Sequence, residues 1–142
     1  MLDVVEHIQD DTGVIKDVYN VLGPNGTFIA TVPAYQWMWS QHDVVHMHYR
    51  RYNRKNFNKL LTDNGFEIVF SSYYNHLLFL PAVLKRFADF LMGNKKNDNP
   101  VDEVSPFLNK LFTKIFTYES KFLHFLKPPF GLSIVTIAKK VK

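Results

Sequence analysis

The 142-residue sequence contains no cysteine, which excludes a disulfide framework, a thiolate metal site and a cysteine nucleophile. It also lacks a long apolar run. The stretch over residues 68–84 has no Lys, Arg, Asp or Glu but includes serines, tyrosines and a proline, whereas a bilayer span needs about 20 consistently apolar residues. Residues 1–11 are acidic and do not resemble a secretory leader. We therefore expect a cytoplasmic protein, with peripheral membrane contact left open.

Charge of neither sign dominates. Lys and Arg number 17 and Asp and Glu 13, which gives a net charge of +4. That balance is not a nucleic-acid signature by itself and could equally favour an anionic lipid surface. Hydrophobic residues make up 46% of the chain and charged residues 21%, too apolar a composition for a disordered protein. The length suits one domain around one core.

The start of the chain predicts a βαβ unit. Residues 2–7 read as the end of a strand that runs into a loop. Asp10 is suited to cap a helix over residues 10–22, and the Gly-Pro-Asn-Gly turn at 23–26 ends that helix. Residues 27–32 form a short apolar run, typical of a strand covered on both faces in a parallel sheet. We expect the crossover to be right-handed.

The rest of the chain predicts further alternation of helix and strand. The expected elements are a helix over 53–64, a strand over 66–74, a helix over 77–92, a polar linker over 93–104, a helix over 105–126 and a strand over 132–138. Residues 33–52 are rich in aromatic side chains and histidines that keep no single period. We predict a loop with a short helix there, at the carboxyl end of a strand, where ligands bind in open α/β sheets.

Several segments resemble the C-terminal half of class I S-adenosylmethionine-dependent methyltransferases. They are Leu2-Asp3-Val4-Val5-Glu6-His7-Ile8, Val21-Leu22-Gly23-Pro24-Asn25-Gly26, Thr31-Val32-Pro33, Trp39-Ser40-Gln41-His42-Asp43 with Arg50-Arg51-Tyr52, and Phe130-Gly131-Leu132-Ser133. The first resembles the family's fourth-strand motif, and the second resembles the turn before its fifth strand. Gly23 and Asn25 depart from the usual Lys and Gly, but asparagine tolerates the left-handed conformation of such a turn.

This resemblance implies an α/β fold, the C-terminal part of a Rossmann-like methyltransferase sheet, in one partial domain over residues 1–142. Residues 77–130 would then be a helical insertion between the last two strands. None of the six glycines forms the Gly-x-Gly-x-Gly loop that lets backbone approach the cofactor. We therefore expect Met1 to be an internal methionine or a boundary. The open sheet edge beside Leu2 predicts a homo-oligomer or low stability alone.

The cofactor implied by the resemblance is S-adenosyl-L-methionine. Its binding residues are expected to be Leu2, Asp3, Val4, Val5, Glu6 and His7. Two roles stay open for His7, a structural or capping role and a role in moving a substrate proton. Glu6 either pairs with a nearby basic group or is a surface carboxylate. The reaction would be methyl transfer to a small or lipid-linked acceptor, which needs alignment more than covalent assistance.

The acceptor is expected at the segment that follows the 27–32 strand. Its predicted binding residues are Tyr35, Trp37, Trp39, Arg50, Arg51 and Tyr52. The aromatic rings could shape an apolar wall or contact the sulfonium by cation–π attraction, or they could simply fill core beneath a loop. The arginines could hold a phosphate or carboxylate, or lie on a solvated helix start with their stems over apolar surface.

His42 and His46 are the predicted catalytic residues, with one of them as a general base. They are four positions apart and share a face if the segment is helical. With Asp43 they could instead bind a metal, as in His-Asp phosphohydrolases. We expect no metal, because the all-helical pattern of those enzymes is absent.

A function from another class is also open. The chain could be a non-catalytic, membrane-associated helical module, because lysines flank the wide apolar faces of the 77–130 segment. No nucleic-acid partner is expected.

Overall fold

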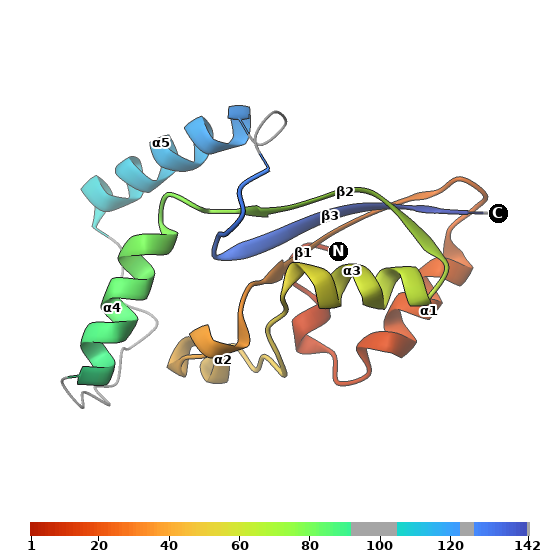
Figure 1. Cartoon of the computed structure of the whole chain (residues 1–142), viewed down its shortest axis with the longest axis horizontal. Coiled ribbons are helices and arrows are strands. Elements are labelled where there is room, and N and C mark those ends of the chain that lie inside the picture. The colour runs from red at the N-terminus through yellow and green to blue at the C-terminus, as the bar shows by residue number, and fades with distance from the viewer. Residues whose placement is uncertain (92–104, 123–126, 142) are drawn as a thin grey trace.

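The computed structural model describes residues 1–91, 105–122 and 127–141 (Figure 1). The predicted linker over 93–104 and the end of the helix predicted over 105–126 lie outside these residues. The elements in chain order are η1 Val5–His7, α1 Asp11–Val21, β1 Thr27–Pro33, η2 Gln36–Met38, α2 Gln41–Val45, α3 Arg54–Asp63, β2 Phe66–Tyr74, α4 Phe79–Leu91, α5 Pro106–Phe122 and β3 Ser133–Lys140.

The strands form a small antiparallel sheet in the order β1-β3-β2. β3 pairs antiparallel with both neighbours, so that Ser133 lies opposite Pro33 on one side and Tyr74 on the other. Because β1 and β2 both oppose β3, they run parallel to each other. Leu2 adds a parallel bridge to Thr31 of β1. The predicted α/β class is confirmed, and the carboxyl ends of all three parallel segments meet at one edge of the sheet.

Local sequence chemistry explains the first helix and its turn. Asp10 is the N-cap of α1, and its side chain accepts a hydrogen bond from the backbone N–H of Gly13 over 2.8 Å. After α1, Asn25 adopts a φ of 59°, the left-handed conformation that asparagine tolerates. A left-handed residue also follows α3: Gly65, directly after the C-cap, has a φ of 91°.

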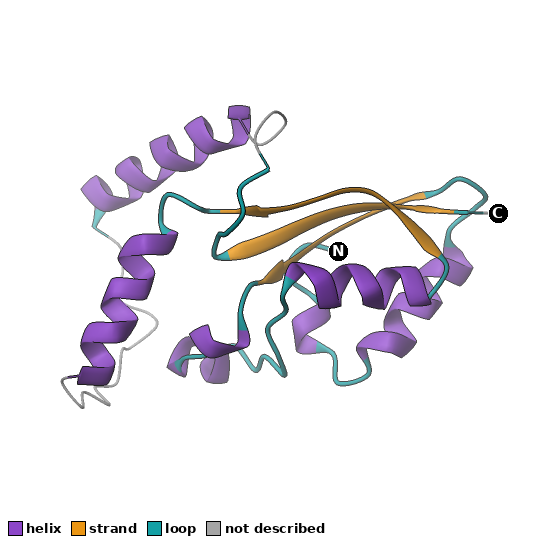
Figure 2. Ribbon diagram, in the orientation of Figure 1, coloured by secondary structure: helices purple, strands orange, loops and turns teal. Residues whose placement is uncertain are grey.

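The core lies between the sheet and two helices on one of its faces (Figures 1 and 2). It includes Phe28, Ala30 and Val32 of β1, Ile15 of α1, Phe57 and Leu61 of α3, and Ile134 and Ala138 of β3. The opposite face is more open, with Ile29 48% and Val69 60% exposed. The expectation that the 27–32 strand is covered on both faces was therefore wrong for the described residues. α1, which precedes β1, and α3, which precedes β2, both cover the same face of the sheet (Figure 2).

α4 and α5 lie beyond one end of the sheet (Figure 1). Pro81 falls in the first turn of α4, where its missing N–H group needs no intrahelical partner. A carboxylate oxygen of Glu119, buried in α5, accepts a hydrogen bond from the backbone N–H of His76 over 2.9 Å and lies 2.9 Å from its Nδ1. This contact joins α5 to the segment after β2. Within the described residues, no helix is both long and apolar enough to cross a membrane.

We expect Gly131→Ala to lower the free energy of unfolding by about 1–3 kcal/mol. A β-carbon at this position would overlap the backbone carbonyl of Tyr74, which cannot move without disturbing the end of β2. Gly23→Ala is the matched control, because a β-carbon there meets nothing within 4 Å. Urea unfolding measures both. Equal stability of the two variants would contradict the close approach of residue 131 to β2.

Candidate functional site

The predicted site residues come from segments that leave the carboxyl edge of the sheet. η1 follows the Leu2 bridge, and residues 34–52 follow β1. Backbone hydrogen bonds tie the two together: the N–H of Tyr49 donates to the carbonyl of Glu6 over 2.7 Å. The returning chain also pairs with the end of β1, since the N–H of Tyr52 donates to the carbonyl of Pro33 over 3.0 Å. The site is therefore a loop anchored at both ends on the sheet.

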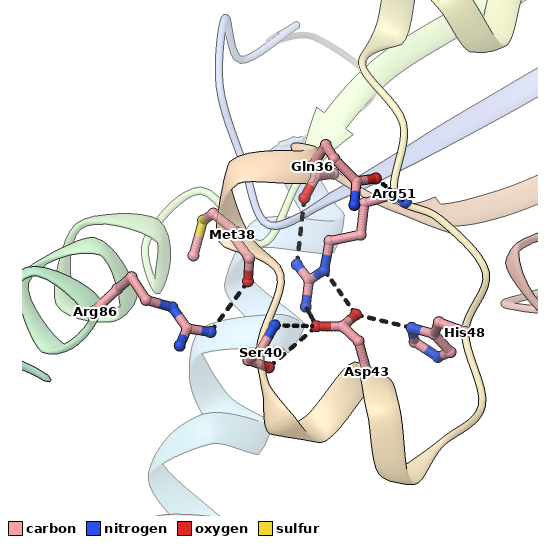
Figure 3. Close-up of polar contacts among 8 residues, drawn as sticks. Gln36, Met38, Ser40, Asp43, His48, Arg51 and Arg86 are labelled. Carbon is pink, nitrogen blue, oxygen red and sulfur yellow. Dashed lines mark hydrogen bonds and ion pairs between the residues drawn. The ribbon is translucent and has the colours of Figure 1, made fainter. Parts of the chain in front are cut away.

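A fully buried carboxylate, Asp43, lies at the centre of this loop (Figure 3). The guanidinium of Arg51 donates to both of its oxygens, over 2.7 and 3.0 Å. The backbone N–H and hydroxyl of Ser40 donate to Oδ2 over 2.8 and 3.0 Å, completing a capping box at the start of α2. Nδ1 of His48 lies 2.9 Å from Oδ1. Arg51 also donates to the carbonyl of Ala34, directly after β1.

These contacts fix the charge of Asp43. Burial alone would raise the pKa of this carboxyl, but the hydrogen bonds from Arg51 and His48 outweigh it and lower the pKa to about 2. Asp43 is therefore ionised at neutral pH and paired with a bidentate arginine. This pairing gives the loop a fixed shape.

A second set of contacts, centred on Asp11, holds Arg50 and Tyr52, which were also predicted to bind the acceptor. Nη1 of Arg50 lies 2.6 Å from Oδ2 of Asp11, and the hydroxyl of Tyr52 donates to the same oxygen over 2.8 Å. Arg50 also donates to the carbonyl of Gln9. Tyr52 is buried and packs against Phe57. All three residues of the predicted Arg-Arg-Tyr motif thus contact protein groups that shape the site.

The structure gathers four histidines in this region. His42 and His46 lie at the two ends of α2 with ring centroids 4.1 Å apart, so the expected shared face is confirmed. His7 of η1 meets His48 edge to face at 4.5 Å. His48 lies 6.2–6.5 Å from the rings of the α2 pair. Burial lowers the pKa of His42, and the neighbouring His46 lowers it further, which favours a neutral ring.

Glu6 was expected either on the surface or in an ion pair. Its side chain is buried, so the surface position was wrong. Among the described residues, its Oε2 has no hydrogen-bond partner. Burial raises the pKa of this carboxyl to about 7. The other predicted cofactor residues form the turn that leads into it. Asp3 has a φ of 50° and donates to Thr31, Leu2 and Val4 are exposed, and Val5 is buried in the core.

The predicted aromatic residues divide into two groups. Tyr35 stacks on Tyr73 at 5.3 Å and lies near Trp37 and Phe79, each with its ring centroid 5.6 Å from that of Tyr35. Trp37 is largely exposed, whereas Trp39 is half-buried and has no ring partner among the described residues. Burial and a hydrogen bond with Tyr73 raise the pKa of Tyr35 to about 12. Tyr35 and Trp37 thus form one end of an aromatic surface.

The sequence reasoning missed three members of this aromatic surface, namely Tyr73, Phe79 and Phe130. They come from β2, α4 and the segment before β3, far from residue 35 in the chain. The position of Tyr73 at the carboxyl end of a predicted strand was a usable signal. Phe130 lies in the Phe130-Gly131-Leu132-Ser133 segment that resembles the methyltransferases, whereas the predicted helix gave no such indication for Phe79.

No family model matches the sequence, and no curated protein matches it. Solved structures share its fold. Phosphoethanolamine N-methyltransferase 2 of Haemonchus contortus, in complex with S-adenosyl-L-methionine, superposes with a TM-score of 0.52 at 13% identity over 99% of this chain and 32% of that chain. A chain of the complex between the Trm112 methyltransferase activator and a methyltransferase of Haloferax volcanii gives 0.51 at 14% identity over 99% of this chain and 52% of that one.

A protein of Galdieria sulphuraria assigned as a sarcosine dimethylglycine methyltransferase also gives a TM-score of 0.51, at 12% identity over 99% of this chain and 51% of that chain. At these identities the likeness shows the fold alone. The fold is that of the class I S-adenosylmethionine-dependent methyltransferases, as expected. This chain spans between about a third and about half of the length of these proteins.

We expect Asp43→Asn to lower the free energy of unfolding by about 3 kcal/mol at neutral pH, because it leaves the buried Arg51 unpaired. The folded-state pKa of Asp43 is about 2 against an ordinary 3.8, so its contribution is present above pH 3.8 and is lost as the pH falls through 2. The difference between parent and variant should shrink across that interval in urea unfolding.

Asp63→Asn is the control for this measurement. The Lys59–Asp63 pair on α3 is also close, at 2.7 Å, but both side chains are largely exposed. Its loss should change the stability by less than about 1 kcal/mol. If both variants lost the same stability, Asp43 would not be the anchor of the loop.

Proposed function

We propose that the chain is part of a methyltransferase domain that transfers a methyl group from S-adenosyl-L-methionine to a small or lipid-linked acceptor. The observation that carries this proposal is the meeting of η1 and residues 34–52 at the carboxyl edge of three parallel segments. Ligands of open α/β sheets bind at this edge. The methyltransferase fold of the solved neighbours supports the same reading.

Residues 2–7 are proposed to bind the cofactor. They turn sharply at Asp3 and present backbone and the exposed Val4 directly beyond the end of a parallel segment. The bound cofactor would supply a methyl group already activated by the positive charge of its sulfonium. The chain then has to align the acceptor, exclude water and, where the acceptor carries a proton, accept it.

The histidines at α2 are proposed to serve the proton step. His42 keeps a lowered pKa and is favoured in its neutral form, as a general base must be. His46 lies against it. Tyr35, Trp37 and Trp39 are proposed to border the acceptor, with Trp37 as the most exposed of them. The Arg50-Arg51-Tyr52 segment would border it as a scaffold, because its side chains bind protein carboxylates.

The domain organisation remains part of the proposal. Residues 1–142 would be one partial domain, and residues 77–130 an insertion whose helices α4 and α5 lie beyond the acceptor end of the sheet. Arg86 of α4 donates to the carbonyl of Met38 over 3.1 Å, which joins the insertion to the loop after β1 (Figure 3). Such a contact would let the insertion form a lid on the acceptor side. The sheet edge beside Leu2 is proposed to pair with a second copy of the chain.

Calorimetry with S-adenosylhomocysteine tests the cofactor assignment. The full-length protein expressed from its native reading frame should show saturable heat, and Val4→Arg should weaken that binding by about tenfold or more, because a large cation would stand at the proposed cofactor edge. Val21→Arg is the matched control, since Val21 is an exposed valine at the far end of α1. Absence of saturable heat from the folded protein would overturn the proposal.

A specific feature of α4 supports a second candidate function, docking on an anionic lipid surface. Leu80, Leu84, Phe87 and Leu91 follow at spacings of four, three and four residues, and all are largely exposed. Lys110, Lys114 and Lys121 of α5, the other helix of the proposed insertion, add basic charge within a chain of net charge +4. An exposed apolar stripe in a basic segment is typical of an interfacial helix.

Sedimentation with lipid vesicles tests this docking. The protein should sediment with vesicles that contain phosphatidylserine and less with pure phosphatidylcholine. The double variant Leu84→Ser with Phe87→Ser should bind about tenfold more weakly, because two large apolar side chains leave the interface. Val21→Ser, which removes an equally exposed apolar residue from α1, should bind like the parent. Equal binding by both variants would exclude α4 as the docking surface.

A further inference from the structure

Three potential metal ligands lie together where η1 meets the loop after α2. Glu6, His7 and His48 each offer one ligand atom, and these atoms all lie within 4.8 Å of one another. The two histidine rings are in edge-to-face contact at 4.5 Å. The neighbouring backbone fixes this meeting, because the carbonyl of Glu6 accepts a hydrogen bond from the N–H of Tyr49 over 2.7 Å.

The carboxylate of this cluster has an unused acceptor. Glu6 is 1% exposed, and its Oε2 is buried without a hydrogen-bond partner among the described residues. A buried polar atom without a partner costs stability, so native proteins rarely keep one without a reason. A cation bound beside His7 and His48 would give this carboxylate a partner.

His48 is already oriented as metal-binding histidines are. Its Nδ1 faces Oδ1 of Asp43 at 2.9 Å, so that an Nδ1 proton donated to this carboxylate leaves the lone pair of Nε2 for a ligand. Arg51 and Ser40 hold Asp43 in turn. A carboxylate–histidine pair of this kind fixes the ring tautomer and raises the basicity of the free nitrogen.

The donor types match a definite class of metal. We propose that Glu6, His7 and His48 bind a divalent transition-metal ion of the zinc class, with a remaining coordination position open to water or a ligand. Two histidines and one glutamate are an established ligand set for zinc in proteins. The proposal goes beyond methyl transfer. It shares Glu6 and His7 with the residues proposed to bind the cofactor and uses neither His42 nor His46.

The three ligand atoms, which lie within 4.8 Å of one another, would have to move only slightly closer together to bind one ion. Zinc lies about 2.0–2.1 Å from its nitrogen ligands, so two ligand atoms on one ion are at most about 4.2 Å apart. His7 is exposed and its side chain is free to rotate into place, whereas Glu6 and His48 are held by their surroundings. The other histidine pair is a poorer site, because both oxygens of the adjacent Asp43 already accept hydrogen bonds from Arg51.

Metal titration of the chelator-treated full chain tests this site. Cobalt(II) should produce a saturable visible absorption at one equivalent, and zinc(II) should displace it. Glu6→Gln and His7→Ala should each weaken cobalt binding by at least about tenfold, a loss seen even when an outer-shell partner is removed. Thermal unfolding of each variant in the absence of metal reports whether it folds. Because His7 is exposed, His7→Ala keeps the test valid if Glu6→Gln does not fold.

His46→Ala separates this site from simple binding to the α2 histidine pair. Saturable binding that survives His46→Ala and is lost in His7→Ala supports the proposed site. Loss in His46→Ala with full binding in His7→Ala would assign the metal to His42 and His46 and overturn the proposal. Absence of saturable cobalt absorption in the folded parent would overturn it as well. All of these readouts are independent of cofactor binding.

Discussion

The shape of the site depends on one buried ion pair. Asp43 accepts both prongs of the Arg51 guanidinium, and Arg51 also reaches the carbonyl of Ala34 at the end of β1. Several apolar side chains of this loop, among them Trp37, Val44 and Met47, are exposed and do not hold it against the core. A fixed carboxylate with several donors holds the loop instead. Each donor to Asp43 comes from a different part of the loop, and the orientation of His48 follows from this arrangement.

The position of the site depends in turn on the sheet. β3 lies antiparallel between β1 and β2, so the chain returns through the middle of the sheet and leaves the carboxyl ends of the parallel segments together at one edge. Gly131 allows the return by a close approach to the backbone of Tyr74. Since α1 and α3 cover only one face, the apolar residues Ile29 and Val69 remain exposed on the other. Helices thus cover one face of the sheet in the part of the chain that the structure describes, as is common for antiparallel sheets, and the proposed site lies at its edge.

Sequence reasoning succeeded where the causes are local. The cap at Asp10, the left-handed turn at Asn25 and the shared face of His42 and His46 follow from neighbours a few residues apart. It failed where the cause is a distant contact. The burial of Glu6 results from chain returning more than 40 residues later, and the stacking of Tyr35 on Tyr73 joins the ends of two strands. Pattern and spacing carry no information on such pairs.

The use of Arg50 and Arg51 as scaffold has a consequence for the chemistry of the site. Methyl transfer from a sulfonium requires alignment to within a fraction of an ångström, and a rigid loop supplies it better than mobile charged side chains do. The arginines of the loop are paired with Asp11 and Asp43, so their charges are compensated within the protein. A positively charged methyl donor at the proposed site would meet less repulsion than beside unpaired arginines, and an exposed ring such as Trp37 would offer it cation–π attraction. The internal ion pairs therefore suit the proposed reaction because they compensate the positive charge of the loop.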